Sequence, residues 1–174
     1  MAIALRSAPG MGSAIRLHTA RLTLALQTLD EVRASVAAMD DASRAQISPD
    51  WLDRLNASTG PDPWVQSFSM VRKGDGVIIG QCGFKGPPDA EGVVEIAYGV
   101  SADAEGKGFA TEAAQALLDY ALTVDQVRLV RAHTLPDGRA SQRVLAKCGF
   151  KYLGEITDPQ DGVISRFEVS RRGQ

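Results

Sequence analysis

The chain has 174 residues, of which 44% are apolar and 23% are charged. This is the balance of an ordinary globular protein with one core. The formal net charge of −2 argues against a nucleic-acid partner, and no run of Lys or Arg indicates a membrane-bound surface. No segment reaches the ~18 consecutive apolar residues that cross a bilayer. We therefore expect a cytoplasmic protein that acts on a small molecule or on another protein.

The N-terminus and the cysteines point to no special chemistry. The apolar stretch at the start lacks the charge order of a signal peptide, and Met11 is a second candidate start. We expect a flexible extension over residues 1–13 and a single domain over residues 14–172. The two cysteines, Cys82 and Cys148, lack the spacing of metal ligands, so we expect reduced thiols and no metal site.

Alternating apolar residues predict a strand over residues 21–26 at the start of the domain. Thr28 and Glu31 then form the sequence of a capping box, which marks the beginning of a helix. The other elements expected in this half are a short helix over residues 50–55 and strands over residues 64–72, 77–84 and 91–100, with Gly74-Asp75-Gly76 as a hairpin turn.

The second half of the chain alternates helices and strands. Apolar residues from Ala110 to Ala121 recur at helical spacing. The remaining elements expected are a buried strand over residues 127–134, a helix from an Asp137 cap to Lys147 with Gly149 after it, and strands over residues 150–156 and 163–169. Without a linker or a repeat, the pattern predicts one α/β (α+β) domain with a mixed, mostly antiparallel sheet flanked by helices.

Two glycines separate a predicted strand from the helix that follows. Gly106 and Gly108 would let an anion approach the unpaired N–H groups of the first helical turn. The alternative is a tight connection in which glycine only provides a positive φ. Two other phosphate motifs are excluded. A Walker A loop needs Ser or Thr after Lys107 and Gly in place of Ser101, and a dinucleotide fingerprint needs Gly in place of Thr111.

Four segments carry a further pattern of motifs. They are Thr19-Ala-Arg-Leu-Thr-Leu24, Ile79-Gly80-Gln-Cys-Gly-Phe84, Val94-Glu-Ile-Ala-Tyr-Gly-Val100 followed by Glu105-Gly-Lys-Gly-Phe-Ala-Thr-Glu112, and Ala140-Ser-Gln-Arg-Val-Leu-Ala-Lys-Cys-Gly-Phe150. In order and spacing these segments resemble the GNAT superfamily of N-acetyltransferases, and within it the RimJ/RimL branch. The resemblance covers about residues 17–170, and it implies a GNAT-like fold and acetyl transfer from acetyl-CoA to a primary amine.

The resemblance also implies where acetyl-CoA binds. The backbone from Glu105 to Ala110 would hold the pyrophosphate, and strand Glu95–Val100 would pair with the pantetheine arm. The family usually has Arg or Gln in place of Glu105 and Asn in place of Gly138, so Lys107 and the backbone amides are expected to bind the phosphates. The implied cofactor contacts are Tyr98, Gly99, Val100, Glu105, Gly106, Lys107, Gly108, Phe109, Ala110, Thr111 and Ser141.

Acetyl transfer needs a base for the amine proton and an acid for the departing thiolate. Glu95 is the candidate base, because strand alternation puts its carboxylate on the same face as Ala97. The alternative is an exposed residue or the partner of an Arg. By the resemblance, Ser141 is the candidate acid, with Tyr98 and Tyr152 in reserve.

The sequence narrows the class of acceptor but does not identify the acceptor. An α-amine is neutral at pH 7 more often than a lysine side chain, which favours a protein N-terminus or a small amine. Trp51 and Trp64 are expected to line the acceptor side, and His133 is interpreted as a core or wall residue. A homodimer stays open. Two other functions also stay open: a non-catalytic acyl-CoA-binding regulatory module and a transferase for another acyl group.

Overall fold

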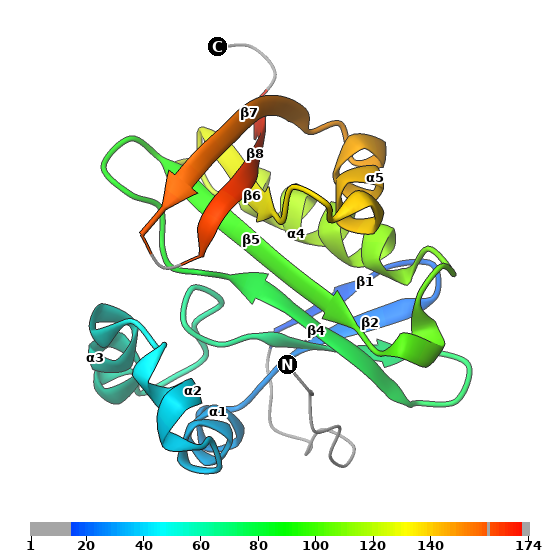
Figure 1. The fold of residues 1–174 in the computed structure, drawn as a ribbon. Coiled ribbons are helices and arrows are strands. Elements are labelled where there is room, and N and C mark those ends of the chain that lie inside the picture. The colour runs from blue at the N-terminus through cyan, green and yellow to red at the C-terminus, as the bar shows by residue number, and fades with distance from the viewer. Residues whose placement is uncertain (1–14, 160, 172–174) are drawn as a thin grey trace.

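The computed structural model describes residues 15–159 and 161–171, so the extension expected over residues 1–13 lies outside the described residues. The described strands form one sheet in the order β1-β2-β3-β4-β5-β6-β8-β7 (Figure 1). Every neighbouring pair is antiparallel except β5 and β6, which confirms the expected mixed sheet. The strands are β1 (Arg16–His18), β2 (Leu22–Leu26), β3 (Phe68–Arg72), β4 (Ile78–Phe84), β5 (Val93–Val100), β6 (Leu129–Thr134), β7 (Lys151–Asp158) and β8 (Gly162–Ser170).

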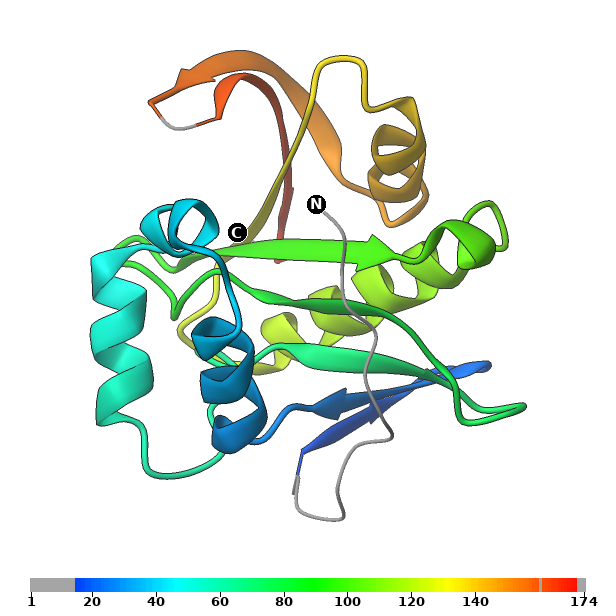
Figure 2. The same ribbon diagram turned by 60° about the horizontal axis from the view of Figure 1, so that its bottom comes forward.

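The helices fall into two groups. The first three lie together on one part of the molecule, apart from the other two, in both views (Figures 1 and 2). The helices are α1 (Leu29–Ala37), α2 (Asp41–Ala45), α3 (Pro49–Ala57), α4 (Phe109–Thr123) and α5 (Arg139–Lys147).

The sheet face that packs on α4 holds most of the core. Val94 and Ile96 of β5 and Val130 of β6 are buried there. Because side chains alternate along a strand, Glu95 of β5 belongs to the opposite face, which is left for polar side chains. The buried residues of α4 are Phe109, Ala113, Ala114, Leu117, Leu118 and Ala121.

Most predicted elements of the first half are confirmed. The Thr28 capping box forms, with Glu31 N donating to Thr28 Oγ1 at 3.2 Å. The strand expected over residues 64–72 begins only at Phe68. The reason is a turn in which Trp64 N donates to Asp62 Oδ1 at 2.8 Å, which removes Trp64 from the sheet.

The start of α5 differs from the prediction. Asp137 is not the cap, because the N-cap is Gly138, which provides no side chain. A Cβ at Gly138 would lie 3.0 Å from Leu135 O, so the Asn that the family favours would crowd this turn. β1 and α2 are too short to leave a periodic pattern in the sequence.

The first turn of α4 is tied to the segment before β2. Glu112 Oε2 accepts hydrogen bonds from Thr19 Oγ1 at 2.7 Å and from Arg21 N at 3.1 Å, and Arg21 Nε donates to Glu112 Oε1. Burial disfavours the charged carboxylate, but these hydrogen bonds outweigh it and lower the pKa of Glu112. One carboxylate therefore positions the helix start against the first strands.

Replacing Glu112 by Gln should destabilise the fold in a pH-dependent way. Because the folded-state pKa lies below the unfolded value, the carboxylate contributes stability that is complete above about pH 4.3 and lost as the pH falls through the lowered value. We expect E112Q to lose about 1–2 kcal/mol of unfolding free energy at neutral pH, the size of a hydrogen bond to a charged group. Urea unfolding at neutral pH and near pH 3 measures the difference, which should close in acid. An equal deficit at both pH values would contradict it.

Candidate active site

The loop between β5 and α4 has the geometry of an anion site. Gly106 and Gly108 adopt φ of 69° and 83°, and Gly108 is the N-cap of α4 without a side-chain cap. Among the described residues, nothing accepts a hydrogen bond from the backbone N–H groups of residues 106–111. Free N–H groups at a helix N-terminus attract negative charge. This loop can therefore hold a phosphate on its main chain.

The charged side chains of the loop contribute little to this site. Glu105 is exposed, so solvent screens its carboxylate. Lys107 Nζ donates to Asp103 O at 2.7 Å, which draws this cation back to the turn before the loop. An anion at this loop would thus be bound mainly by the main chain.

Arg21 is a cation beside the loop that sequence reasoning missed. Its guanidinium lies 4.5 Å from the centre of the Phe109 ring, and Nη2 would be 3.1 Å from a Cβ on Gly108. Glu112 holds it in place. Because Arg21 is distant from the loop in sequence, only its place in the first family segment could have drawn attention to it.

β5 and β6 pair over a short stretch only. Their parallel register ends at Glu95 and Arg131, although both strands continue and β6 pairs with β8 as far as Thr134. After Glu95, no strand in the described part of the chain pairs with the main chain of β5 on the β6 side. An open strand edge of this kind can pair with another extended chain.

Tyr98 and Ser141 meet beyond this point. Tyr98 OH donates to Ser141 O at 3.3 Å, which brings together two of the predicted site residues from β5 and α5. Burial raises the pKa of Tyr98, and the nearby Cys148 adds to the effect, so the hydroxyl stays protonated at neutral pH. Tyr152 lies on β7 with its ring 5.2 Å from that of Phe167.

Glu95 is the centre of a charged cluster. Its Oε1 lies 2.6 Å from Lys85 Nζ and 3.0 Å from His133 Nδ1. Neither contact has the geometry of a hydrogen bond, so the attraction between Glu95 and Lys85 is mainly electrostatic. The side chain of Glu95 is 22% exposed. The sequence alone did not place Lys85 or His133 here, because the register of three strands decides which residues meet.

Trp64 and the two cysteines pack inside the protein. Trp64 packs on Phe84 at 4.7 Å and near Tyr120 of α4. It thus belongs to the α4 side of the sheet, and its expected contact with an acceptor stays a prediction. Both cysteines are buried and free, and burial raises the pKa of the Cys148 thiol to about 11.

Trp51 lies in a separate small core. Its Nε1 donates to Val65 O at 3.1 Å, and it packs with Val32 and Leu55. Its proposed contact with an acceptor stays a prediction.

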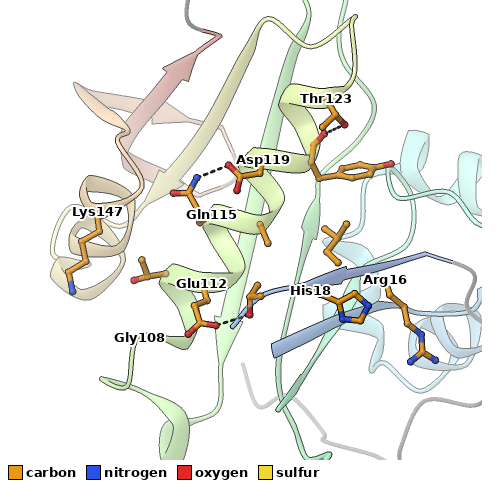
Figure 3. Close-up of a pocket in the computed structure, with 13 residues that line it drawn as sticks. Arg16, His18, Gly108, Glu112, Gln115, Asp119, Thr123 and Lys147 are labelled. Atoms are coloured by element: carbon orange, nitrogen blue, oxygen red, sulfur yellow. Dashed lines mark hydrogen bonds between the residues drawn. The ribbon is translucent and has the colours of Figure 1, made fainter. Parts of the chain in front are cut away.

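A groove of about 780 Å³ runs along α4 next to β1 (Figure 3). Glu112, Gln115 and Asp119 of α4 line it together with Arg16 and His18 of β1. None of its lining residues belongs to β5 or β6, so it is separate from the Glu95 cluster.

The described part of the chain contains neither a membrane-spanning helix nor a group of metal ligands. Over residues 15–159 and 161–171, no helix is long and apolar enough to span a membrane. Over the same residues, His, Cys, Asp and Glu form no group of three or more that could hold a metal ion.

A comparison with models of known protein families finds a match, and this match includes the open glycine loop and the strands β5 and β6. The model of the acetyltransferase (GNAT) domain, Acetyltransf_3, matches residues 13–151, which is most of the chain. The protein therefore belongs to the GNAT acetyltransferase family.

Individual relatives agree with this assignment. The chain is 36% identical over 99 residues to the uncharacterized N-acetyltransferase YjdG of Bacillus subtilis, a match over 57% of this chain and 56% of that protein. The match thus spans about half the length of YjdG. The chain is also 28% identical over 156 residues to the uncharacterized N-acetyltransferase p20 of Bacillus licheniformis, covering 82% of this chain and 85% of that protein.

A solved structure of RimL shares the fold. RimL, a ribosomal L7/L12 α-N-protein acetyltransferase solved in complex with coenzyme A, aligns with a TM-score of 0.66 and 13% identity over 92% of this chain and 100% of RimL. RimL is thus among the structural neighbours, as the resemblance to the RimJ/RimL branch implied, and at this identity the likeness is one of fold.

Gly108→Ala should weaken coenzyme A binding more than Gly106→Ala. Both alanines are strained at a positive φ, which costs about 1 kcal/mol of stability in each variant. Only the Cβ at position 108 would also meet Arg21, since nothing lies within 4 Å of one at Gly106. We expect the dissociation constant for coenzyme A to rise about tenfold more in G108A, equivalent to about 1.4 kcal/mol. Calorimetric titration measures it, with Gly86→Ala, in open space, as the control. Equal weakening in both loop variants would refute the role of Arg21.

Proposed function

We propose that the protein transfers an acetyl group from acetyl-CoA to a primary amine by direct attack of the amine on the thioester. The observation that carries the proposal is the row of N–H groups over residues 106–111 without an acceptor among the described residues. It follows the open edge of β5 after a turn that contains the 3-10 helix Ala102–Ala104. A main-chain anion site next to an unpaired strand edge suits a ligand with a pyrophosphate and an extended arm.

The proposed cofactor contacts follow from this arrangement. The backbone of Glu105–Ala110 would hold the pyrophosphate, with Arg21 as a neighbouring positive charge. Tyr98, Gly99 and Val100 would pair with the pantetheine arm along the β5 edge. A Cβ at Gly106 would meet nothing within 4 Å, which supports an approach of the phosphate to the main chain at this point.

The proposed reaction uses the charged cluster and the Tyr98–Ser141 contact. Acetyl-CoA supplies an activated thioester, so a C–N bond forms as the C–S bond breaks. Glu95 would receive the amine proton, and the neighbouring His133, whose Nδ1 lies 3.0 Å from Glu95 Oε1, would stabilise the carboxyl group that forms. The Ser141 hydroxyl would give a proton to the departing sulfur. Tyr98, which is held protonated, is the reserve for this role.

For the acceptor we propose a protein N-terminus or a small α-amine. An α-amine has a lower pKa than a lysine side chain and is neutral more often at pH 7. It therefore asks less of a weak base such as Glu95. The structural neighbour RimL acetylates the α-amine of a ribosomal protein, by its name.

One observation favours a second candidate, a non-catalytic acyl-CoA-binding module. Lys85 Nζ already lies 2.6 Å from Oε1 of Glu95, the proposed base. A carboxylate neutralised by lysine is a poorer proton acceptor unless Lys85, whose side chain is 52% exposed, moves away when the amine binds.

Glu95→Gln should lower kcat without changing the affinity for coenzyme A. The loss of a general base costs about 10²- to 10⁴-fold in rate, while the glycine loop keeps its main-chain contacts. Release of the coenzyme A thiol with a panel of amines gives kcat, and calorimetry gives the affinity. Glu155→Gln, on exposed β7, is the matched control.

The same assay separates the alternatives. Binding of coenzyme A by the wild type without thiol release from acetyl-CoA with any amine would favour the binding module. Preference for succinyl-CoA over acetyl-CoA in competition would indicate another acyl group. Unchanged kcat in E95Q would contradict Glu95 as the base.

A further inference from the structure

The sheet face around Glu95 carries more positive than negative charge. Its carboxylates are both engaged: Arg131 Nε lies 2.7 Å from Glu168 Oε1, and Lys85 Nζ lies 2.6 Å from Glu95 Oε1. The ionisable residues of this face, from β5, β6, β8 and the end of β4, are Lys85, Glu95, Arg131, His133, Arg166 and Glu168. After these pairings, Arg166 is the cation left over among these residues, and β7 adds a further cation, Lys151, opposite Glu168 in the register.

Arg166 has no partner in the described part of the chain. Its side chain is half-buried, and its Nε is fully covered and makes no hydrogen bond. No ion pair of Arg166 forms within residues 15–159 and 161–171. A covered charged donor without an acceptor is costly, because the lost hydration is not replaced. The Nη atoms of Arg166 are not among the covered unpartnered atoms, so an anionic ligand can pair with the guanidinium from that side.

His133 stands next to Arg166. The two residues are direct partners in the β6–β8 register, so their side chains are on the same face. His133 Nδ1 is 3.0 Å from Glu95 Oε1, while Nε2 is covered and unpartnered. A carboxylate beside Nδ1 favours a proton on that nitrogen, which leaves a lone pair on Nε2. A proton-accepting pair thus adjoins an unpaired cation.

We propose that the acceptor carries a carboxylate next to its amine, and that Arg166 binds this carboxylate while the amine lies at the Glu95–His133 pair. The inference rests on the proposed acetyl transfer and narrows its acceptor to α-amino acids and molecules with the same two groups. Cross-strand neighbours have Cβ atoms about 4.5–5.5 Å apart, which suits the short separation of two groups on one carbon. A guanidinium can donate two parallel hydrogen bonds to a carboxylate.

The residues around this pair leave room for a small ligand. Gly154 is the partner of Arg166 on β7, and a Cβ there would meet nothing within 4 Å. Ala97, on the same face as Glu95, is exposed. Small side chains therefore border the charged cluster on both sides.

Three acceptors with one side chain test the inference. Leucine has the carboxylate, leucinamide has a neutral carbonyl in its place, and 3-methylbutylamine has neither. Release of the coenzyme A thiol gives kcat and KM, and kcat/KM is then divided by the neutral fraction of each amine at the assay pH. We expect kcat/KM of the wild type to be at least about tenfold higher for leucine than for leucinamide or 3-methylbutylamine. A tenfold difference is about what one charge-assisted hydrogen bond contributes. Series with other side chains repeat the comparison.

Variants of two arginines complete the test. Arg166→Gln should remove the advantage of leucine over 3-methylbutylamine by raising the KM of leucine. Arg54→Gln, which removes an exposed cation from α3, should keep the wild-type preference. Persistence of the preference in R166Q would overturn the role of Arg166.

The remaining outcomes separate this inference from the proposed function. Equal kcat/KM for leucine and 3-methylbutylamine would overturn the carboxylate site and leave acetyl transfer intact. Equal values for leucine and leucinamide would show that a neutral carbonyl suffices, as in a peptide N-terminus, and would also overturn it. If no acceptor released the thiol, acetyl transfer itself would fail. Calorimetric titration of leucine into the wild type and R166Q, each with coenzyme A bound, would then decide the site: tighter binding by the wild type supports it, and equal binding overturns it.

Discussion

The arrangement of the site depends on the parting of two parallel strands. β5 and β6 pair only from Val93 and Leu129 to Glu95 and Arg131. Each strand keeps another partner beyond that point, since β5 continues along β4 and β6 continues along β8. The backbone on both sides is thus supported by hydrogen bonds while the edge between them is open. The N–H and C=O groups that face the open edge need partners from solvent or from a ligand, because an unpaired backbone group is costly where it is buried.

The two faces of the central sheet carry different kinds of side chain. The face on α4 carries the apolar side chains that hold the strands and the helix together. The opposite face collects charges from strands that are far apart in the sequence, with Glu95 between Lys85 and His133. Because a charged group is costly to cover without a partner, the pairing on this face limits which charges are free to meet a ligand.

The anion site proposed at the glycine loop uses main-chain groups. The identity of the side chains in the loop therefore matters less. Free N–H groups over residues 106–111 depend on the positive φ of Gly106 and Gly108 and on the start of α4. The acidic Glu105 is therefore compatible with an anion site, and Lys107 turns back to Asp103 instead of compensating for it. Positive charge is provided near the loop by Arg21, which Glu112 fixes in position.

The sequence by itself determined the elements with a strong local signal: the Thr28 cap, the apolar stripe of α4, the glycine turn and the alternation of β5. Hydrogen bonding and side-chain periodicity act over a few residues, so these features can be predicted without knowledge of the rest. Only the tertiary structure decided which charges meet. Strand register brings His133 to Glu95 and to Arg166, and a turn at Asp62 moves Trp64 to the other face. The register between strands that are far apart in the sequence is decided when one face of the sheet is buried, so the sequence around each strand does not show which side chains will meet across it.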